Sequence, residues 1–173
     1  MIQFIKTREV KSPERNVNEN AGIDVYIPEN TAEFKKDFLA KNPGFEEGLF
    51  DKVEGKIYIK PHTDIIIPLG IRSKFSHGLA LIANNKSGIA TKKKLIFGAS
   101  VIDESYQGEW HGHMINWSNE LQVVDCGQKI VQFIPHLIAT DELEVLDLSP
   151  KEFFTEETVR GEGWQGSTGS GVK

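Results

Sequence analysis

The chain has 173 residues, 39% of them hydrophobic, and its 20 Lys and Arg against 25 Asp and Glu give a net charge of −5. A chain of this length buries about 70% of its surface on folding, so its stability requires no disulfide or metal. The single cysteine, Cys126, excludes an internal disulfide framework and is typical of a reducing compartment. The acidic balance excludes a broad grip on nucleic acid, although a few residues can still form a local anion pocket.

No apolar run approaches the roughly 20 residues of a membrane span, and the first ten residues lack the apolar core of a secretory leader. We therefore expect a cytoplasmic protein, in the host cytoplasm if it is virus-encoded. We expect no membrane contact and no direct nucleic-acid binding.

Short runs of β-branched and aromatic residues, separated by Gly, Pro, Asn and Asp, make up most of the chain. The expected strands are the segment around Ile2 and Phe4, then 23–27, 56–60, 64–71, 78–84, 94–97, 113–117, 121–124, 129–138 and 143–148. About ten such strands with close turn signals predict an all-β fold, a jelly-roll-like distorted β-barrel.

Residues 31–41 break this pattern, because Phe34 and Phe38 have the spacing of one helix face. Asn30 is the expected N-cap, and Glu33 stands at the capping-box position. The sequence therefore predicts one short helix within an otherwise all-β chain.

The helix is expected to stop at Asn42-Pro43-Gly44, after which a loop-rich stretch runs to residue 55. We interpret 29–55 as one inserted element that is dispensable for catalysis. A binding partner of this insert is possible, but the sequence does not identify one. The aromatic residues of the insert should anchor it on the barrel, since short helices need such packing. These residues are Phe34, Phe38, Phe45 and Phe50.

The C-terminal stretch from Arg160 to Gly169 combines glycines, an arginine, a serine and a threonine. Such residues suit a phosphate, because glycine lets backbone N–H groups approach closely and arginine supplies a bidentate charged donor. The sequence lacks the lysine and the following helix of a Walker A loop. We divide the chain into a barrel domain, 1–159, and a flexible Gly-rich arm, 160–173.

Two further segments carry polar groups next to predicted strands. Lys86 and Ser87 follow a strand and offer a cation and a hydroxyl, although most such turns are only turns. Asp103 and Tyr106 lie between Gly98 and Gly108 at the mouth of a predicted hairpin, where a carboxylate can polarise water and a ring can face a sugar. The alternative is an ordinary hairpin with Tyr106 in the core.

His111 and His113 share one face of a predicted strand, which raises the possibility of a metal site. Zinc needs three or four ligands, and the other histidines are scattered along the chain. We therefore do not expect a transition-metal site here.

Together these segments resemble the trimeric dUTPase family, whose members carry five ordered motifs. The five matching segments occur in family order. They are Ala21-Gly22-Ile23-Asp24-Val25, Lys86-Ser87-Gly88-Ile89-Ala90, Gly98 to Gly108, Gly127 to Gln132, and Arg160 to Gly169.

The resemblance implies a homotrimer with active sites at subunit interfaces, each closed by the C-terminal arm of a neighbour. The implied reaction is hydrolysis of dUTP to dUMP and pyrophosphate by water attack at the α-phosphate, with Mg²⁺ on the triphosphate. This activity supplies dUMP and keeps uracil out of DNA.

By the same resemblance, Asp103 orients or deprotonates the water, and Tyr106 lies under the deoxyribose. The main chain near Gly98 reads the uracil edge, and Asp24 holds water ligands of Mg²⁺. The other implied substrate-binding residues are Lys86, Ser87, Gly88, Gln132, Arg160, Trp164, Gly166, Ser167 and Thr168.

The chain departs from the family pattern at several positions. Lys86 stands where the family usually has arginine, and Gly127-Gln128-Lys129 replaces Gly-Asp-Arg. Gln165 occupies the place of the phenylalanine that stacks on uracil, with Trp164 one residue earlier. His111 replaces a small residue near the base. We expect Trp164 to take over the stacking role.

Two alternatives remain open from the residues. A dCTP deaminase shares this fold and some motifs, and a catalytically weak relative could serve as a regulatory binding protein. Retention of the motif residues argues against the second. An assay of pyrophosphate and ammonia release separates all three functions.

Overall fold

The computed structural model describes residues 1–16, 20–139, 143–156 and 158. The chain divides into two units, Met1–Ala139 and Thr140–Lys173. This division does not test the predicted boundary between the barrel domain, 1–159, and the C-terminal arm, 160–173, which stays a prediction. In the described part of the chain, no helix is long and apolar enough to cross a membrane.

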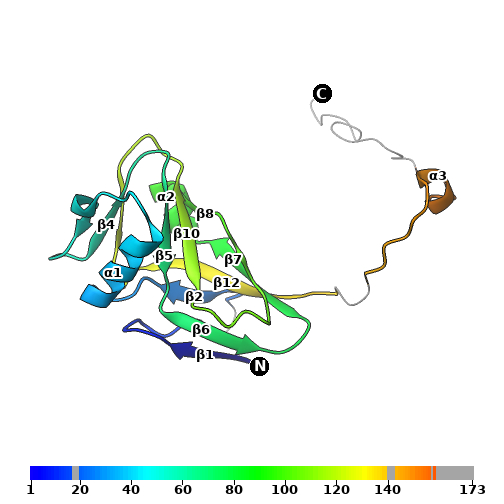
Figure 1. Ribbon diagram of the computed structural model, residues 1–173, viewed down its shortest axis with the longest axis horizontal. Helices are drawn as coiled ribbons and strands as arrows, with labels where there is room; N and C mark the ends of the chain where they lie inside the picture. Colours follow the sequence, from blue (N-terminus) through cyan, green and yellow to red (C-terminus); the bar gives the residue numbers. More distant parts are fainter. Residues whose placement is uncertain (17–19, 140–142, 157, 159–173) are drawn as a thin grey trace. The chain divides into compact units, whose positions relative to one another are not determined.

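The first unit consists mainly of short antiparallel strands (Figure 1). The strands are β1 (Ile2–Lys6), β2 (Ile23–Tyr26), β3 (Phe50–Asp51), β4 (Lys56–Ile59), β5 (Asp64–Pro68), β6 (Ile71–Phe75), β7 (Leu79–Asn85), β8 (Leu95–Phe97), β9 (Val101–Ile102), β10 (His111–Asn116), β11 (Gln122–Asp125) and β12 (Lys129–Leu137). The helices are α1 (Ala32–Lys41), the 3₁₀ turn η1 (Glu47–Leu49) and α2 (Ser87–Lys93), with α3 (Pro150–Phe153) in the second unit.

The strands form four small sheets, ordered β1-β6, β5-β10-β8, β11-β4-β3 and β2-β12-β7-β9. Their inward residues make one core, in which Trp110 is fully buried and packs between Phe4 and Phe133. The all-β, jelly-roll-like class expected from the sequence is confirmed. The central strand β12 lies between β2 and β7, and this arrangement brings segments distant in sequence together.

The insert is part of the core, as its aromatic residues predicted. Phe34 and Phe38 on α1 are fully buried and stack with Phe50 from β3, while Phe45 packs edge-on against Phe38. β3 also pairs with β4 of the barrel. Because the insert shares the barrel core, we no longer expect the chain to tolerate its deletion.

We expect Phe38→Ala to lower the free energy of unfolding by about 3–5 kcal/mol, because it leaves a cavity where a fully buried ring contacts two others. Urea unfolding measures this loss. Val53→Ala, at an exposed position in the same insert, is the matched control and should change stability by less than about 0.5 kcal/mol. An equal effect of both substitutions would contradict the core position of the insert.

The start of α1 differs from the prediction. Thr31, not Asn30, caps the helix, and its hydroxyl oxygen accepts a hydrogen bond from the Phe34 amide at 3.1 Å. Asn30 instead donates to the Lys52 carbonyl at 2.8 Å. Because Thr31 is the N-cap, the capping-box position is Phe34 and not Glu33. The helix ends before Asn42, as predicted.

Two strand predictions and one turn prediction need correction. The run 64–71 is two strands, because Gly70 has a left-handed φ of +69° and turns the chain between β5 and β6. The segment after β7 was interpreted as a turn but continues into α2. The predicted strand 143–148 is absent: Leu143 and Val145 are exposed, and alternating residues form a strand only where another strand pairs with them.

Candidate functional site

A cavity of about 440 Å³ opens where β7 passes into α2 beside β12. It brings together residues from three of the segments picked out in the sequence. Its lining residues are Asn20, Ala21, Lys86, Ser87, Gly88, Ile89, Lys129 and Gln132. The structure thus gathers Lys86, Ser87, Gly88 and Gln132 as expected, and adds Lys129.

The register of the central sheet explains this gathering. Gln132 on β12 lies opposite Asp24 on β2 and opposite Asn84 on β7. Its amide nitrogen donates to the Asn85 carbonyl at 3.3 Å. Gly22 makes room for it, because a Cβ atom at residue 22 would lie 2.5 Å from Gln132 Oε1. The glycine of the first motif is therefore required by the glutamine of the fourth.

Asp24 lies between two lysines behind this cavity. Its side chain is 6% exposed; Lys86 Nζ lies 2.5 Å from Oδ1, and Lys129 Nζ lies 2.9 Å from Oδ2. Asn16 adds a third donor at 3.2 Å. Burial alone would raise the pKa of Asp24, but the hydrogen bonds from the two ammonium groups outweigh it and hold the pKa below its usual value.

This arrangement concentrates positive charge at the cavity. Two lysines share one carboxylate, and both line the opening together with the Ser87 hydroxyl and the Gln132 amide. Asp24 also raises the pKa of Lys129, so that lysine is charged at neutral pH. Donors and cations facing one pocket suit a phosphate chain. We missed Lys129, whose only signal was a basic residue at the end of the altered fourth motif.

The site offers few metal ligands from protein alone. Within the residues that the structure describes, no group of three or more His, Cys, Asp or Glu could hold a metal ion. Magnesium commonly binds through one or two carboxylates together with waters and substrate phosphates. Asp24 fits that pattern, and the pair His111 and His113 does not, since His113 Nε2 lies 3.0 Å from Asp64 Oδ2.

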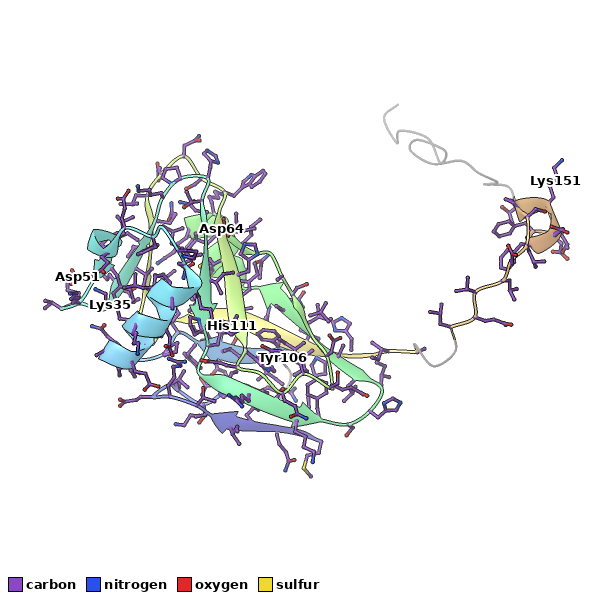
Figure 2. The ribbon with its side chains drawn as sticks, viewed as in Figure 1. Lys35, Asp51, Asp64, Tyr106, His111 and Lys151 are labelled. Atoms are coloured by element: carbon purple, nitrogen blue, oxygen red, sulfur yellow. The ribbon has the colours of Figure 1, made fainter. Side chains whose placement is uncertain are left out.

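The second half of the candidate site lies on the segment between β8 and β10. The Gly98 amide donates to the His113 carbonyl at 2.9 Å, and Asp103 is exposed just after β9. Tyr106 is 39% exposed, which excludes the alternative that placed it in the core. Its hydroxyl donates to the Glu109 carbonyl at 2.8 Å (Figure 2 labels its ring).

The backbones of the two halves are separated on the central sheet. Ile102 pairs with Leu81, whereas Gln132 pairs with Asn84, so the next residue, Asp103, stands four positions along β7 and two strands away. At 3.3 Å per residue and 4.8 Å per strand, the backbones are about 16 Å apart. Asp103 and Gln132 therefore lie on well-separated parts of the central sheet within one chain.

The remaining expected site residues, Arg160, Trp164, Gly166, Ser167 and Thr168, lie outside the described residues. Their roles stay predictions.

His111 is a half-buried imidazole at the start of β10 (Figure 2). Among the described residues its Nε2 atom is buried without a hydrogen-bond partner. Burial lowers the pKa of His111 below the usual 6.5; Lys41 and Arg8 add to this effect, while Glu109 opposes it.

Because the folded pKa of His111 lies below the unfolded value, its contribution to stability is fully present above pH 6.5. That contribution should decline as the pH falls from 6.5 through the folded pKa. We expect the urea midpoint of the parent to fall between pH 7.5 and pH 5.5. His111→Gln should fall less, and His136→Gln, an exposed control, should fall as the parent does. Identical slopes in all three proteins would contradict this account.

Comparison with known proteins identifies the family. The family model described as dUTPase matches residues 49–169. A deoxyuridine 5'-triphosphate nucleotidohydrolase of Finegoldia magna is 33% identical over 121 residues, which are 67% of this chain and 78% of that protein. The enzyme of the same name from Oryza sativa is 35% identical over 116 residues, 66% of this chain and 59% of that protein.

The fold of this chain is also similar to that of a solved dUTPase structure. A Staphylococcus bacteriophage 80alpha dUTPase variant with dUpNHpp superposes with a TM-score of 0.71 at 19% sequence identity, over 98% of both chains. The family model spans most of the chain and includes the segments that build the phosphate-side cavity from Lys86 to Gln132. This chain is therefore a member of the dUTPase family.

Proposed function

We propose that this protein is a dUTP diphosphatase, an enzyme that hydrolyses dUTP to dUMP and pyrophosphate by water attack at the α-phosphate. The observation that carries the proposal is the cavity in which Lys86, Lys129, Ser87 and Gln132 converge beside a buried carboxylate. Its donors fit a triphosphate, the chain matches the dUTPase family model, and a relative named for this activity is 33% identical to it. The reaction supplies dUMP and keeps uracil out of DNA, and we place it in the cytoplasm.

The cavity residues bind and orient the triphosphate. Lys86 is a cation at its mouth, and Ser87 and Gln132 donate hydrogen bonds to phosphate oxygens, with Gly88 leaving space for the chain to approach. Mg²⁺, when bound with the substrate, neutralises the charge that builds up on the phosphates. Asp24 would hold that ion through water, which requires the carboxylate to exchange its lysine partners for those waters.

The segment between β8 and β10 handles the nucleoside and the attacking water. Asp103 is the general base, and its exposed carboxylate is free to meet a water in line with the α-phosphorus. The Tyr106 ring packs under the deoxyribose and leaves no room for a 2′-hydroxyl. The main chain at Gly98 reads the uracil edge.

We propose that a complete site combines residues of more than one copy of the chain, in a homotrimer. The separation of about 16 Å between Asp103 and Gln132, derived from strand spacing, supports this. Large apolar residues are also exposed along the second unit, as expected for a segment that packs on another copy. They are Leu143, Val145, Leu146, Leu148, Phe153 and Phe154. Arg160, Ser167 and Thr168 would cover the distal phosphates, with Gly166 allowing the turn and Trp164 stacking on uracil.

Pyrophosphate release from dUTP, dCTP, dTTP and UTP tests the proposal. We expect release from dUTP alone, dependent on Mg²⁺. Ammonia from dCTP would instead identify a deaminase, and absence of turnover with retained dUTP binding would identify a regulatory binding protein. The family match favours neither alternative.

A further inference from the structure

A buried ion-pair network joins the inserted helix α1 to the segment that carries Asp103 and Tyr106. The guanidinium of Arg8, with 6% of its side chain exposed, is at the centre. Its Nη2 lies 2.9 Å from Asp37 Oδ2 on α1 and 2.7 Å from Glu109 Oε2. Its Nε donates to Glu109 Oε1 at 2.9 Å, so the contact with Glu109 is bidentate.

Glu109 in turn fixes the end of the Asp103–Glu109 loop. Its carboxylate accepts the Gly70 amide at 2.7 Å, which ties the loop to the turn between β5 and β6. Its carbonyl accepts the Tyr106 hydroxyl at 2.8 Å, and the Tyr106 amide donates to the Asp103 carbonyl at 3.1 Å. Ion pairs and hydrogen bonds therefore connect Asp37 to Glu109 through Arg8, and the main chain of Glu109 connects them to Tyr106.

The backbone at Gly70 is shaped for this network. Its φ of +69° is a conformation that side chains disfavour, and a Cβ atom there would lie 2.6 Å from Arg8 Cγ. The glycine thus allows the arginine stem to lie against the turn while its own amide reaches Glu109.

The charges hold the network together. Burial alone would lower the pKa of Arg8, but its hydrogen bonds to Glu109 and Asp37 raise the pKa above its usual value. Arg8 and Glu109 also act on the pKa of the neighbouring His111, which is uncharged at neutral pH. If either Asp37 or Glu109 lost its charge, the positive charge of the buried Arg8 would no longer be fully compensated. We therefore expect the remaining groups around Arg8 to rearrange.

We propose that Asp37, Arg8 and Glu109 are positioning residues that hold the Tyr106 ring in place, so that the insert sets the sugar selectivity of the enzyme. This inference rests on the proposed function, because Tyr106 is there the group that excludes a 2′-hydroxyl. It assigns the insert a role in the active site, in contrast to the expectation from sequence that the insert is an add-on.

The test compares four variants by the ratio of kcat/KM for dUTP to that for UTP. Glu109→Gln keeps the shape of the side chain but removes the charge that pairs with Arg8, and Asp37→Asn does the same on the helix. Asp37→Glu conserves the carboxylate. Glu33→Gln removes an exposed charge from the same helix and is the matched control.

We expect Glu109→Gln to lower the dUTP/UTP ratio most and Asp37→Asn to lower it less, within a range of roughly 2- to 30-fold. Asp37→Glu and Glu33→Gln should keep the parent ratio. A merely structural role would lower stability or activity on both nucleotides and leave the ratio unchanged, and that result would overturn the proposal.

A second measurement is independent of activity. Hydrogen exchange of the 103–109 peptide should be faster in Asp37→Asn than in the parent and in Glu33→Gln. Asp37 is 41% exposed on its side chain, so its substitution should leave the protein folded. Unchanged exchange in Asp37→Asn would overturn the network even in a protein that does not hydrolyse dUTP, which separates this failure from failure of the proposed function.

Discussion

Asp103→Asn should abolish dUTP turnover while leaving nucleotide binding nearly intact. Loss of a general base typically costs roughly 10²–10⁴-fold in rate, and asparagine has the same size but accepts no proton. Asp103 is exposed after β9, and its main-chain carbonyl accepts a hydrogen bond from the Tyr106 amide. Because asparagine keeps this main-chain bond, the substitution should not disturb the fold. Steady-state pyrophosphate release measures the rate, and titration with dUpNHpp measures binding.

Glu120→Gln, which neutralises another exposed carboxylate, is the control for a general effect of charge and should keep the parent rate. If the Asp103→Asn variant turned over dUTP at a near-parent rate, Asp103 would have no part in the chemistry.

Removal of residues 160–173 should leave a folded oligomer without activity. The sequence of the arm contains only two large apolar residues, Trp164 and Val172, so we expect the core not to depend on it. The arm supplies an arginine and two hydroxyls to the proposed phosphate site, and its glycines lose much entropy on ordering, which favours closure only over bound substrate. Thermal unfolding, size-exclusion chromatography and pyrophosphate release together measure the outcome.

Trp164→Ala is the finer version of the same experiment. Stacking of an aromatic ring on a base contributes roughly 1–3 kcal/mol, so dUTP use should weaken by about 5- to 150-fold. Gln165→Ala should have a much smaller effect. Loss of the oligomer on truncation, or equal effects of the two alanine variants, would show that the arm is structural.

The periodicity of apolar side chains along the sequence predicted helix α1 and several of the strands correctly. The alternation in β2, β4, β7 and β12 and the Phe34–Phe38 spacing are local, and each was confirmed. The run 143–148 failed because pairing is not local: the same alternation forms a strand only beside a partner. The N-cap was wrong by one residue: the Thr31 hydroxyl accepts the Phe34 amide, and the Asn30 side chain donates to the Lys52 carbonyl.

The candidate site shows the same division. Residue types pointed to Lys86 and Ser87, and the resemblance to the dUTPase family implied Asp24 and Gln132, but only the register of β12 between β2 and β7 shows that these residues converge. The role of Lys129 depends on a contact 105 positions away in the chain, with Asp24. The ion pairs of Arg8 with Asp37 and Glu109 are equally non-local, and a chain with 45 charged residues offers many possible pairings. Pairings of this kind require the folded structure.

The central claim is that the phosphate half and the water-activating half of one site come from different copies of the chain. The most direct test mixes two inactive variants, Asp103→Asn and the double variant Ser87→Ala with Gln132→Ala, by unfolding and refolding them together in equal amounts. Random assembly should restore about one quarter of the parent dUTP activity. In an equal mixture, about half of the sites receive an intact Asp103, and about half of those also receive an intact Ser87 and Gln132 from another copy. Each variant refolded alone should stay inactive. A refolded mixture of mixed oligomers with no activity would contradict the claim, because it would require both halves to come from the same chain.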